Sequence, residues 1–227
     1  FYMGEFVGVM GKSGAGKTTL VNMVTGLDHL TAGDVNIGGI SIKDLNENQI
    51  AVWRGRNVGI VFQTNRLMPT LSLLDNVMLP IDLCGDYNRS QSRELAMELL
   101  RRVELEEHAF KLPSAISGGQ QQRVAIARAL ANDPAIIVAD EPTGRLDSVT
   151  SEVIYQIFRD LAARGKLIIM VSHDISIVNR LTRRIDLVDG VIAHDSGADS
   201  AQNSGVDLAQ NDLAASAQDE DITEEAK

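Results

Sequence analysis

The chain has 227 residues, of which 44% are hydrophobic, and its formal net charge is −10. This length suits one α/β domain with an appended subdomain, and the net negative charge argues against a nucleic-acid partner. No apolar run approaches the roughly 18 residues that a membrane-spanning helix needs, and the single cysteine, Cys84, excludes an internal disulfide.

The chain opens directly on a strand and a glycine-rich loop. Residues 6–10 (FVGVM) predict a short buried strand, and the abrupt start leads us to expect that an N-terminal β segment is missing. Gly11–Thr18 (GKSGAGKT) then fits the phosphate-loop pattern of two glycines followed by Lys and Ser/Thr. Apolar residues at helical spacing predict a helix from Thr18 to Thr25. A strand before the loop and a helix after it are the context that this pattern requires.

The residue types of this loop suit a phosphate chain. Glycines let the backbone approach the phosphates with its N–H groups pointing inward, and the helix N-terminus favours negative charge. Lys17 brings a positive charge, and the Thr18 hydroxyl is a ligand for Mg²⁺. A chance match would occur in roughly one chain in a hundred of this length. The predicted phosphate-binding residues are Gly11, Lys12, Ser13, Gly14, Ala15, Gly16, Lys17, Thr18 and Thr19.

The next stretch alternates strands with helical patterns. A short strand is expected over 34–37 and a polar helix over 42–54, with Trp53 as a packing residue. Residues 58–62 predict a buried strand that Gln63 ends. From 71 to 114 only helical patterning is present, with one apolar face expected from Leu95, Ala96, Leu99, Leu100 and Val103.

The second half continues the alternation. Ser117 and Gln120 form a candidate capping box that starts a helix to about residue 131. A buried strand over 135–139 ends in Asp140 and Glu141, and another over 167–171 ends at 172–174. The helix between them is expected to turn inward Val153, Ile154, Ile157, Phe158 and Leu161. A final hairpin has its turn at 189–190.

This order of elements predicts a doubly wound, mostly parallel α/β sheet. We expect a core of residues 1–70 and 130–195, an inserted helical subdomain over 71–129, and a tail over 196–227. The tail holds eight carboxylates against one lysine and contains no aromatic residue. Such a composition cannot bury enough apolar surface to offset ordering, so the tail is predicted to be disordered.

Polar residues follow four of the predicted strands: the phosphate loop, Gln63, Asp140 with Glu141, and His173. Ligands of open α/β sheets bind beyond the carboxyl ends of the strands, so we expect these groups to converge. Asp140 suits Mg²⁺ binding, and Glu141 suits orienting or deprotonating a water for attack on a γ-phosphate. Taken singly, the Asp-Glu pair also fits a helix N-cap, and His173 also fits a histidine that only bonds backbone.

The residues ISGGQ (116–120), continued as QQRVAIARAL, resemble the signature of ABC transporter ATPase subunits. The resemblance extends over residues 4–193 and implies a P-loop NTPase with a RecA-like core. By this resemblance Gly11–Thr18 is the Walker A loop, Gln63 the Q-loop glutamine and Mg²⁺ contact, and Asp140 the end of Walker B. Glu141 is then the catalytic glutamate and His173 the switch histidine. The implied cofactors are ATP and Mg²⁺.

The resemblance also implies an assembly. Two subunits of this family pair head-to-tail around ATP, and each Walker A site is completed by the partner's Ser117, Gly118, Gly119 and Gln120. A separate integral-membrane permease is the expected partner, which places the subunit in the cytoplasm on the inner face of the membrane. No membrane span and no nucleic acid are expected for the chain itself.

Finer matches, such as VFQ (61–63) and ADEPTG (139–144), are similar to the lipoprotein-release, macrolide-export and cell-division subgroup. Three residues depart from its usual pattern: Lys12, Ala15 and Arg145. The resemblance favours an ATP-driven motor subunit. The alternative is an ATP-dependent regulatory clamp of a permease-linked complex, without solute transport.

Overall fold

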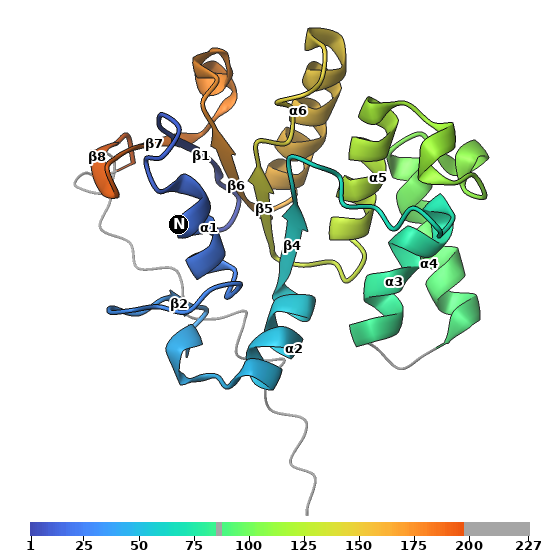
Figure 1. The fold of residues 1–227 in the computed structure, drawn as a ribbon, viewed down its shortest axis with the longest axis horizontal. Coiled ribbons are helices and arrows are strands. Elements are labelled where there is room, and N and C mark those ends of the chain that lie inside the picture. Colours follow the sequence, from blue (N-terminus) through green and yellow to red (C-terminus); the bar gives the residue numbers. More distant parts are fainter. Residues whose placement is uncertain (85–87, 198–227) are drawn as a thin grey trace, which may run out of the picture.

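The computed structural model describes residues 1–84 and 88–197, and its centre is a six-stranded sheet in the order β4-β5-β6-β1-β7-β8 (Figure 1). All neighbours in this sheet are parallel except β7 and β8, which pair antiparallel. The predicted α/β fold with a mainly parallel sheet is confirmed. The strands are β1 (Phe6–Met10), β4 (Val58–Val61), β5 (Ile136–Asp140), β6 (Leu167–Ser172), β7 (Arg183–Val188) and β8 (Val191–Asp195).

Helices cover both faces of the sheet, and a separate hairpin lies beside it (Figure 1). The α-helices are α1 (Lys17–Val24), α2 (Glu47–Asn57), α3 (Leu73–Cys84), α4 (Arg89–Arg102), α5 (Gly118–Ala129) and α6 (Ser148–Ala163). The hairpin pairs β2 (Asn36–Ile37) with β3 (Ile40–Ser41). Short 3₁₀ helices are η1 (Ile42–Asp44), η2 (Glu106–His108), η3 (Pro113–Ala115) and η4 (Ile175–Arg180).

Alternate residues of β1, β5 and β6 enter two different hydrophobic cores, as the period of two in a strand requires. Phe6 of β1 joins the core under α6, where its ring centroid lies 6.2 Å from that of Phe158. Val7 joins the opposite core, together with Val21 of α1 and Trp53 of α2. Trp53 is therefore a packing residue, as predicted. The apolar runs became strands because both faces of the sheet are covered.

Helices α3, α4 and α5 pack against one another to the right of β4 in Figure 1. Asn76 of α3 is fully buried and fixes the segment before α3. Its side chain accepts the N–H of Met68 and donates to the carbonyl of Met68. Helix α5 also packs against β4, so it belongs to both layers. The division at 71–129 stays a prediction, and from residue 198 the acidic tail lies outside the described residues.

Three local expectations were wrong. The helix expected over 42–54 is split into η1 and α2, because the Asn46 side chain accepts the Gln49 N–H and starts a new helix with a capping box. Leu95 is 39% exposed and Val153 is 41% exposed, so neither belongs to the inward face of its helix. Each lies beside the buried stripe, where a helix of 3.6 residues per turn places a neighbouring position.

Arg183 of β7 links the edge strand β8 to the rest of the sheet. Its guanidinium donates two hydrogen bonds to Asp195 of β8, at 2.8 and 2.7 Å, and also lies 3.4 Å from the Glu5 carboxylate. These hydrogen bonds lower the pKa of Asp195 to about 2. Within residues 1–84 and 88–197, no helix combines the length and apolar character needed to cross a membrane.

The ion pair between Arg183 and Asp195 predicts that part of the free energy of unfolding is lost in acid. Because the folded pKa of Asp195 is lowered from 3.8 to about 2, its contribution is complete above pH 4 and is lost as the pH falls toward 2. We expect Asp195→Asn to lower the free energy of unfolding by roughly 2 kcal/mol at pH 7 and by almost nothing near pH 2. Urea unfolding of both proteins at several pH values measures this difference.

The matched control is Glu98→Gln, which removes an exposed ion pair with Arg102 within α4. Exposed pairs of this kind contribute little, so the control should change the free energy of unfolding by less than about 0.5 kcal/mol. Equal losses in the two variants at pH 7 would contradict the special role of Asp195.

Candidate active site

The glycine-rich loop connects β1 to α1, as its sequence requires. Gly14 and Gly16 have φ angles of 85° and 95°, which residues with a side chain rarely adopt. Helix α1 starts without a side-chain cap among the described residues, so backbone N–H groups of its first turn stay available to a ligand. Lys17 is 7% exposed, and its ammonium donates to the carbonyls of Gly11 and Lys12 at 2.8 and 2.9 Å. The loop thus places a buried cation beside free N–H donors.

The β7–β8 turn supports this loop. Gly190 donates its N–H to the carbonyl of Ala15 at 3.0 Å, and Ala15 is buried. A Cβ on Gly11 would lie 2.5 Å from the carbonyl oxygen of Leu187, so the loop approaches β7 only because residue 11 is glycine. The sequence predicted the turn at 189–190, but nothing in it indicated this contact. Lys12 is exposed.

Asp140 and Thr18 form a pair of oxygen ligands beside the loop. The Thr18 hydroxyl lies 3.5 Å from Asp140 Oδ2. Burial and, secondarily, the neighbouring Glu141 carboxylate raise the pKa of Asp140, while Thr18 and Lys17 oppose this rise. A carboxylate that is destabilised by burial gains from a cation placed next to it. Among the described residues, no group of three or more His, Cys, Asp and Glu side chains is arranged to hold a metal ion by itself.

Glu141 follows β5 and has a left-handed backbone, with φ of 45°. Its N–H donates to the carbonyl of Val171 in β6 at 2.9 Å, which fixes the residue across the strand end. Its carboxylate accepts a hydrogen bond from Gln63 Nε2 at 3.0 Å and lies 2.8 Å from His173 Nδ1. The expected convergence of the strand-end side chains is therefore present, with Glu141 between Gln63 and His173.

Gly144 leaves room for this arrangement. A Cβ at that position would lie 3.1 Å from Gln63 Nε2 and 3.7 Å from Glu141 Oε2. The histidine is largely exposed and the glutamate is largely covered. The imidazole of His173, which a ligand can reach, is thus positioned by the covered carboxylate of Glu141.

Ser117 starts α5 with the predicted capping box. Its hydroxyl accepts the Gln120 N–H at 3.2 Å, and the Gln120 side chain accepts the Ser117 N–H at 2.9 Å. Gly118 has open space where a Cβ would be, and a Cβ on Gly119 would lie 2.5 Å from Thr150 Cγ2. Helix α5 packs beside β4, whereas the glycine-rich loop follows β1. Strands β5 and β6 lie between β4 and β1, so the chain does not bring these two segments together.

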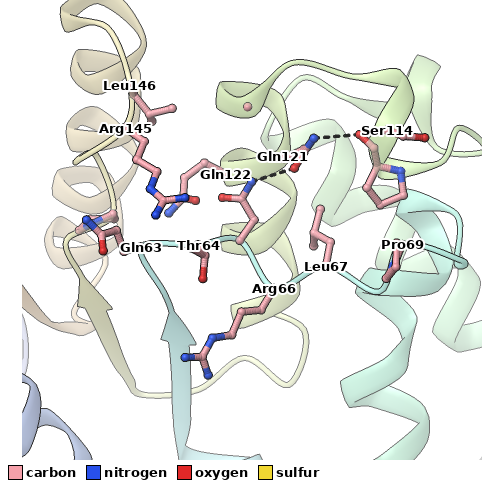
Figure 2. Close-up of a pocket in the computed structure, with 14 residues that line it drawn as sticks. Gln63, Thr64, Arg66, Leu67, Pro69, Ser114, Gln121, Gln122, Arg145 and Leu146 are labelled. Carbon is pink, nitrogen blue, oxygen red and sulfur yellow. Dashed lines mark hydrogen bonds between the residues drawn. The ribbon is translucent and has the colours of Figure 1, made fainter.

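A groove lies between the loop after β4 and helix α5 (Figure 2). Hydrogen bonds link its walls: Asn65 Nδ2 donates to Gln121 Oε1 at 3.0 Å, and Gln122 Nε2 donates to the carbonyl of Phe62 at 3.2 Å. Arg145, in the loop after β5, and Gln63, in the loop after β4, also line it (Figure 2). Among its described lining residues there are two arginines and no carboxylate.

Comparison with known proteins places the chain in a family. The family described as "ABC transporter" matches residues 1–144. A macrolide export ATP-binding/permease protein MacB of Syntrophobacter fumaroxidans is 47% identical over 197 residues, which are 86% of this chain and 28% of that protein. A lipoprotein-releasing system ATP-binding protein LolD 1 of Chlorobium chlorochromatii is 44% identical over 193 residues, 85% of this chain and 78% of that protein. The chain therefore spans about a quarter of the MacB relative and most of the LolD relative.

Solved structures agree with these matches. The dimeric post-hydrolysis state of the ATP-binding cassette MJ0796 bound to ADP and Pi has a TM-score of 0.79 and 44% identity, covering 85% of each chain. An ABC transporter ATP-binding protein MJ0796 from Methanocaldococcus jannaschii is 45% identical over 196 residues, 85% of this chain and 83% of that protein. The fold, the phosphate loop and the strand-end carboxylates thus lead to one conclusion: the chain belongs to the ATP-binding cassettes of the ABC transporter family.

Proposed function

We propose that this chain binds and hydrolyses ATP as the nucleotide-binding subunit of an ABC transporter complex. The observation that carries the proposal is the Glu141 carboxylate, held between Gln63 and His173 at the same sheet edge as the phosphate loop. The post-hydrolysis structure of the MJ0796 cassette with ADP and Pi, at 44% identity, supports the same reaction.

The phosphate loop holds the triphosphate in this proposal. Backbone N–H groups of residues 11–16 and of the first turn of α1 donate to phosphate oxygens. Lys17 exchanges its carbonyl partners for phosphate oxygens, which a buried ammonium binds more strongly because they carry full charge. Thr18 and Thr19 add hydroxyls at the start of the helix.

The residues present fit a Mg²⁺ ion. Mg²⁺ is typically held by one or two protein oxygens together with substrate phosphates, so a three-carboxylate cluster is not required. Thr18 and Asp140 supply such oxygens 3.5 Å apart, and Gln63, whose amide nitrogen donates to the adjacent Glu141, has an amide oxygen as a further ligand. When bound, the ion neutralises charge on the β- and γ-phosphate oxygens.

Glu141 acts as the general base or as the residue that orients the attacking water. Gln63 and His173 each hold one of its two oxygens, so the direction of the remaining lone pairs is fixed. His173 is exposed enough to contact the γ-phosphate as well. Fixing the geometry before the reaction is a large part of phosphoryl-transfer catalysis.

The second half of the site comes from another copy of the chain. Ser117, Gly118, Gly119 and Gln120 form a helix N-terminus with an anion-binding character, and it cannot reach its own phosphate loop across β5 and β6. A head-to-tail dimer brings this N-terminus to the γ-phosphate of the partner, and the dimeric MJ0796 structures support that arrangement.

The membrane permease is supplied by a separate chain, and the complex lies at the cytoplasmic face of the membrane. The name of the MacB relative, an ATP-binding/permease protein, supports a permease as partner, and the name of the LolD relative, an ATP-binding protein alone, supports a permease on a separate chain. ATP-driven closing and opening of the dimer then moves the permease.

The first test replaces the base. Glu141→Gln keeps the shape of the side chain and removes its ability to accept a proton, so we expect kcat to fall by at least a hundredfold, within the range for a general base. ATP affinity should be retained, and light scattering should show more dimer in saturating Mg-ATP than for the wild type. Equal, slow hydrolysis by wild type and variant would contradict the proposed activity.

The second test asks where the helix N-terminus acts. Lys17→Ala and Ser117→Glu should each inactivate the protein, because each variant damages both sites of a homodimer. A mixed dimer of the two variants contains one intact site, so mixing them in equal amounts should restore up to about a quarter of the wild-type rate. If the two groups acted within one chain, the mixture would stay inactive.

A further inference from the structure

Tyr155 is a buried residue with a polar hydroxyl, and it lies outside the phosphate loop and the group of Gln63, Glu141 and His173. It lies in the second turn of α6 and is 4% exposed, so its hydroxyl is almost fully removed from water. That hydroxyl has one partner among the described residues, the Thr143 hydroxyl at 2.8 Å. A buried phenol is stable only with such a partner. Burial, the largest influence, raises the pKa of Tyr155, so the group stays neutral near pH 7.

Thr143 belongs to the short loop that carries the catalytic glutamate. Gly144 N donates to the Glu141 carbonyl at 3.2 Å, and Leu146 N donates to the Thr143 carbonyl at 3.0 Å. These bonds make the loop a compact unit. The hydrogen bond from Tyr155 therefore reaches a segment two residues from Glu141, whose backbone is held at a φ of 45°. Conformations of that kind persist only where the surroundings fix them.

The ring of Tyr155 contacts the other loop of the site through Arg180. The Arg180 guanidinium carbon lies 5.2 Å from the ring centroid, within the range of a cation–π interaction. Arg180 ends η4, the helix that follows His173 and Asp174, and its Nη1 donates to the Ser176 carbonyl at 2.9 Å. Its Nε also donates to Glu152 of α6 at 3.1 Å.

Both catalytic loops thus rest on one side chain. The hydroxyl of Tyr155 holds the loop of Glu141, and its ring holds the helix that follows His173. A phenylalanine would fill the same space in the core. It would leave the Thr143 hydroxyl without this bond, so the hydroxyl group of Tyr155 serves the loop rather than the packing.

We propose that Tyr155 is a positioning residue for ATP hydrolysis, which keeps the Glu141 loop and the His173 loop aligned so that the two side chains stay in contact. This inference rests on the proposed function, because it assigns Tyr155 to the same site. The residue acts through Thr143 and Arg180 and touches neither nucleotide nor water.

The test uses two variants that remove the same hydrogen bond from its two ends, Tyr155→Phe and Thr143→Val. Each should lower kcat by roughly three- to tenfold and change KM for Mg-ATP by less than about twofold, since the phosphate loop is untouched. The double variant should lose no more than the stronger single variant, because the contact is already gone. The matched control is Phe158→Leu, one turn further along α6, which weakens the core contact with Phe6 and leaves the hydrogen bond between Tyr155 and Thr143 in place.

A second readout does not depend on activity. Hydrogen exchange in the absence of nucleotide should increase for peptides covering 141–147 in Tyr155→Phe, with little change over 173–180 because this variant keeps the ring that contacts Arg180. In Phe158→Leu, exchange should increase only for α6 and its sheet neighbours. In the Glu141→Gln background, Tyr155→Phe should have no further effect on the residual rate, because the group that it positions is no longer a base.

The outcomes separate the two proposals. A Tyr155→Phe protein with unchanged kcat and exchange changed no more than in Phe158→Leu would overturn the positioning role and leave the ATPase proposal intact. A wild-type protein without ATPase activity would overturn the proposed function. The exchange comparison would then still decide whether the Tyr155 hydroxyl holds the loop of Glu141.

Discussion

The site depends on the shared carboxylate of Glu141, which binds Gln63 on one side and lies against His173 on the other. The three residues follow β4, β5 and β6, which are neighbours in the sheet. The parallel register pairs Val61 with Ala139 and Asp140 with Val171, so the three chains leave the sheet at the same level. A slip by one residue in either pair would turn the side chains to the other face and separate them. The packing of the sheet thus sets the geometry of the catalytic groups.

The same edge of the sheet accounts for the proposed division of the site between two copies. Strand β1 lies next to β6, which puts the phosphate loop beside His173, and the β7–β8 turn supports the loop from the other side. Helix α5 lies beyond the opposite strand, β4. A single chain therefore has two helix N-termini at one edge, those of α1 and α5, separated by the width of the intervening strands. Both N-termini can contact one phosphate only if a second copy of the chain supplies one of them.

Much of the fold was predictable from residues 6–10, 135–139 and 167–171, because an uninterrupted apolar run suits a strand that is covered on both faces. The meeting of the strand-end residues was also predictable, because parallel strands end at a common edge of the sheet. Helix faces were less predictable. Leu95 and Val153 lie one position away from the buried stripe, and periodicity alone does not place the border of a stripe. The contacts of Gly11, Gly190 and Tyr155 were beyond sequence reasoning, because each depends on which distant segment lies opposite.

Gln63 connects the catalytic carboxylate to the groove beside α5. Its amide donates to Glu141, and the same residue lines the groove whose walls are joined by Asn65 and Gln121. A hydrogen bond of 3.0 Å weakens steeply when its donor moves by an ångström or turns away. Any displacement of the loop after β4 therefore alters the orientation of Glu141 directly. Conversely, a change in the orientation of Glu141 affects the position of the loop after β4, because two linked equilibria influence each other equally. Among the described residues, Gln63 both bonds the Glu141 carboxylate and lines the groove, so a movement of the groove wall would reach this carboxylate through Gln63.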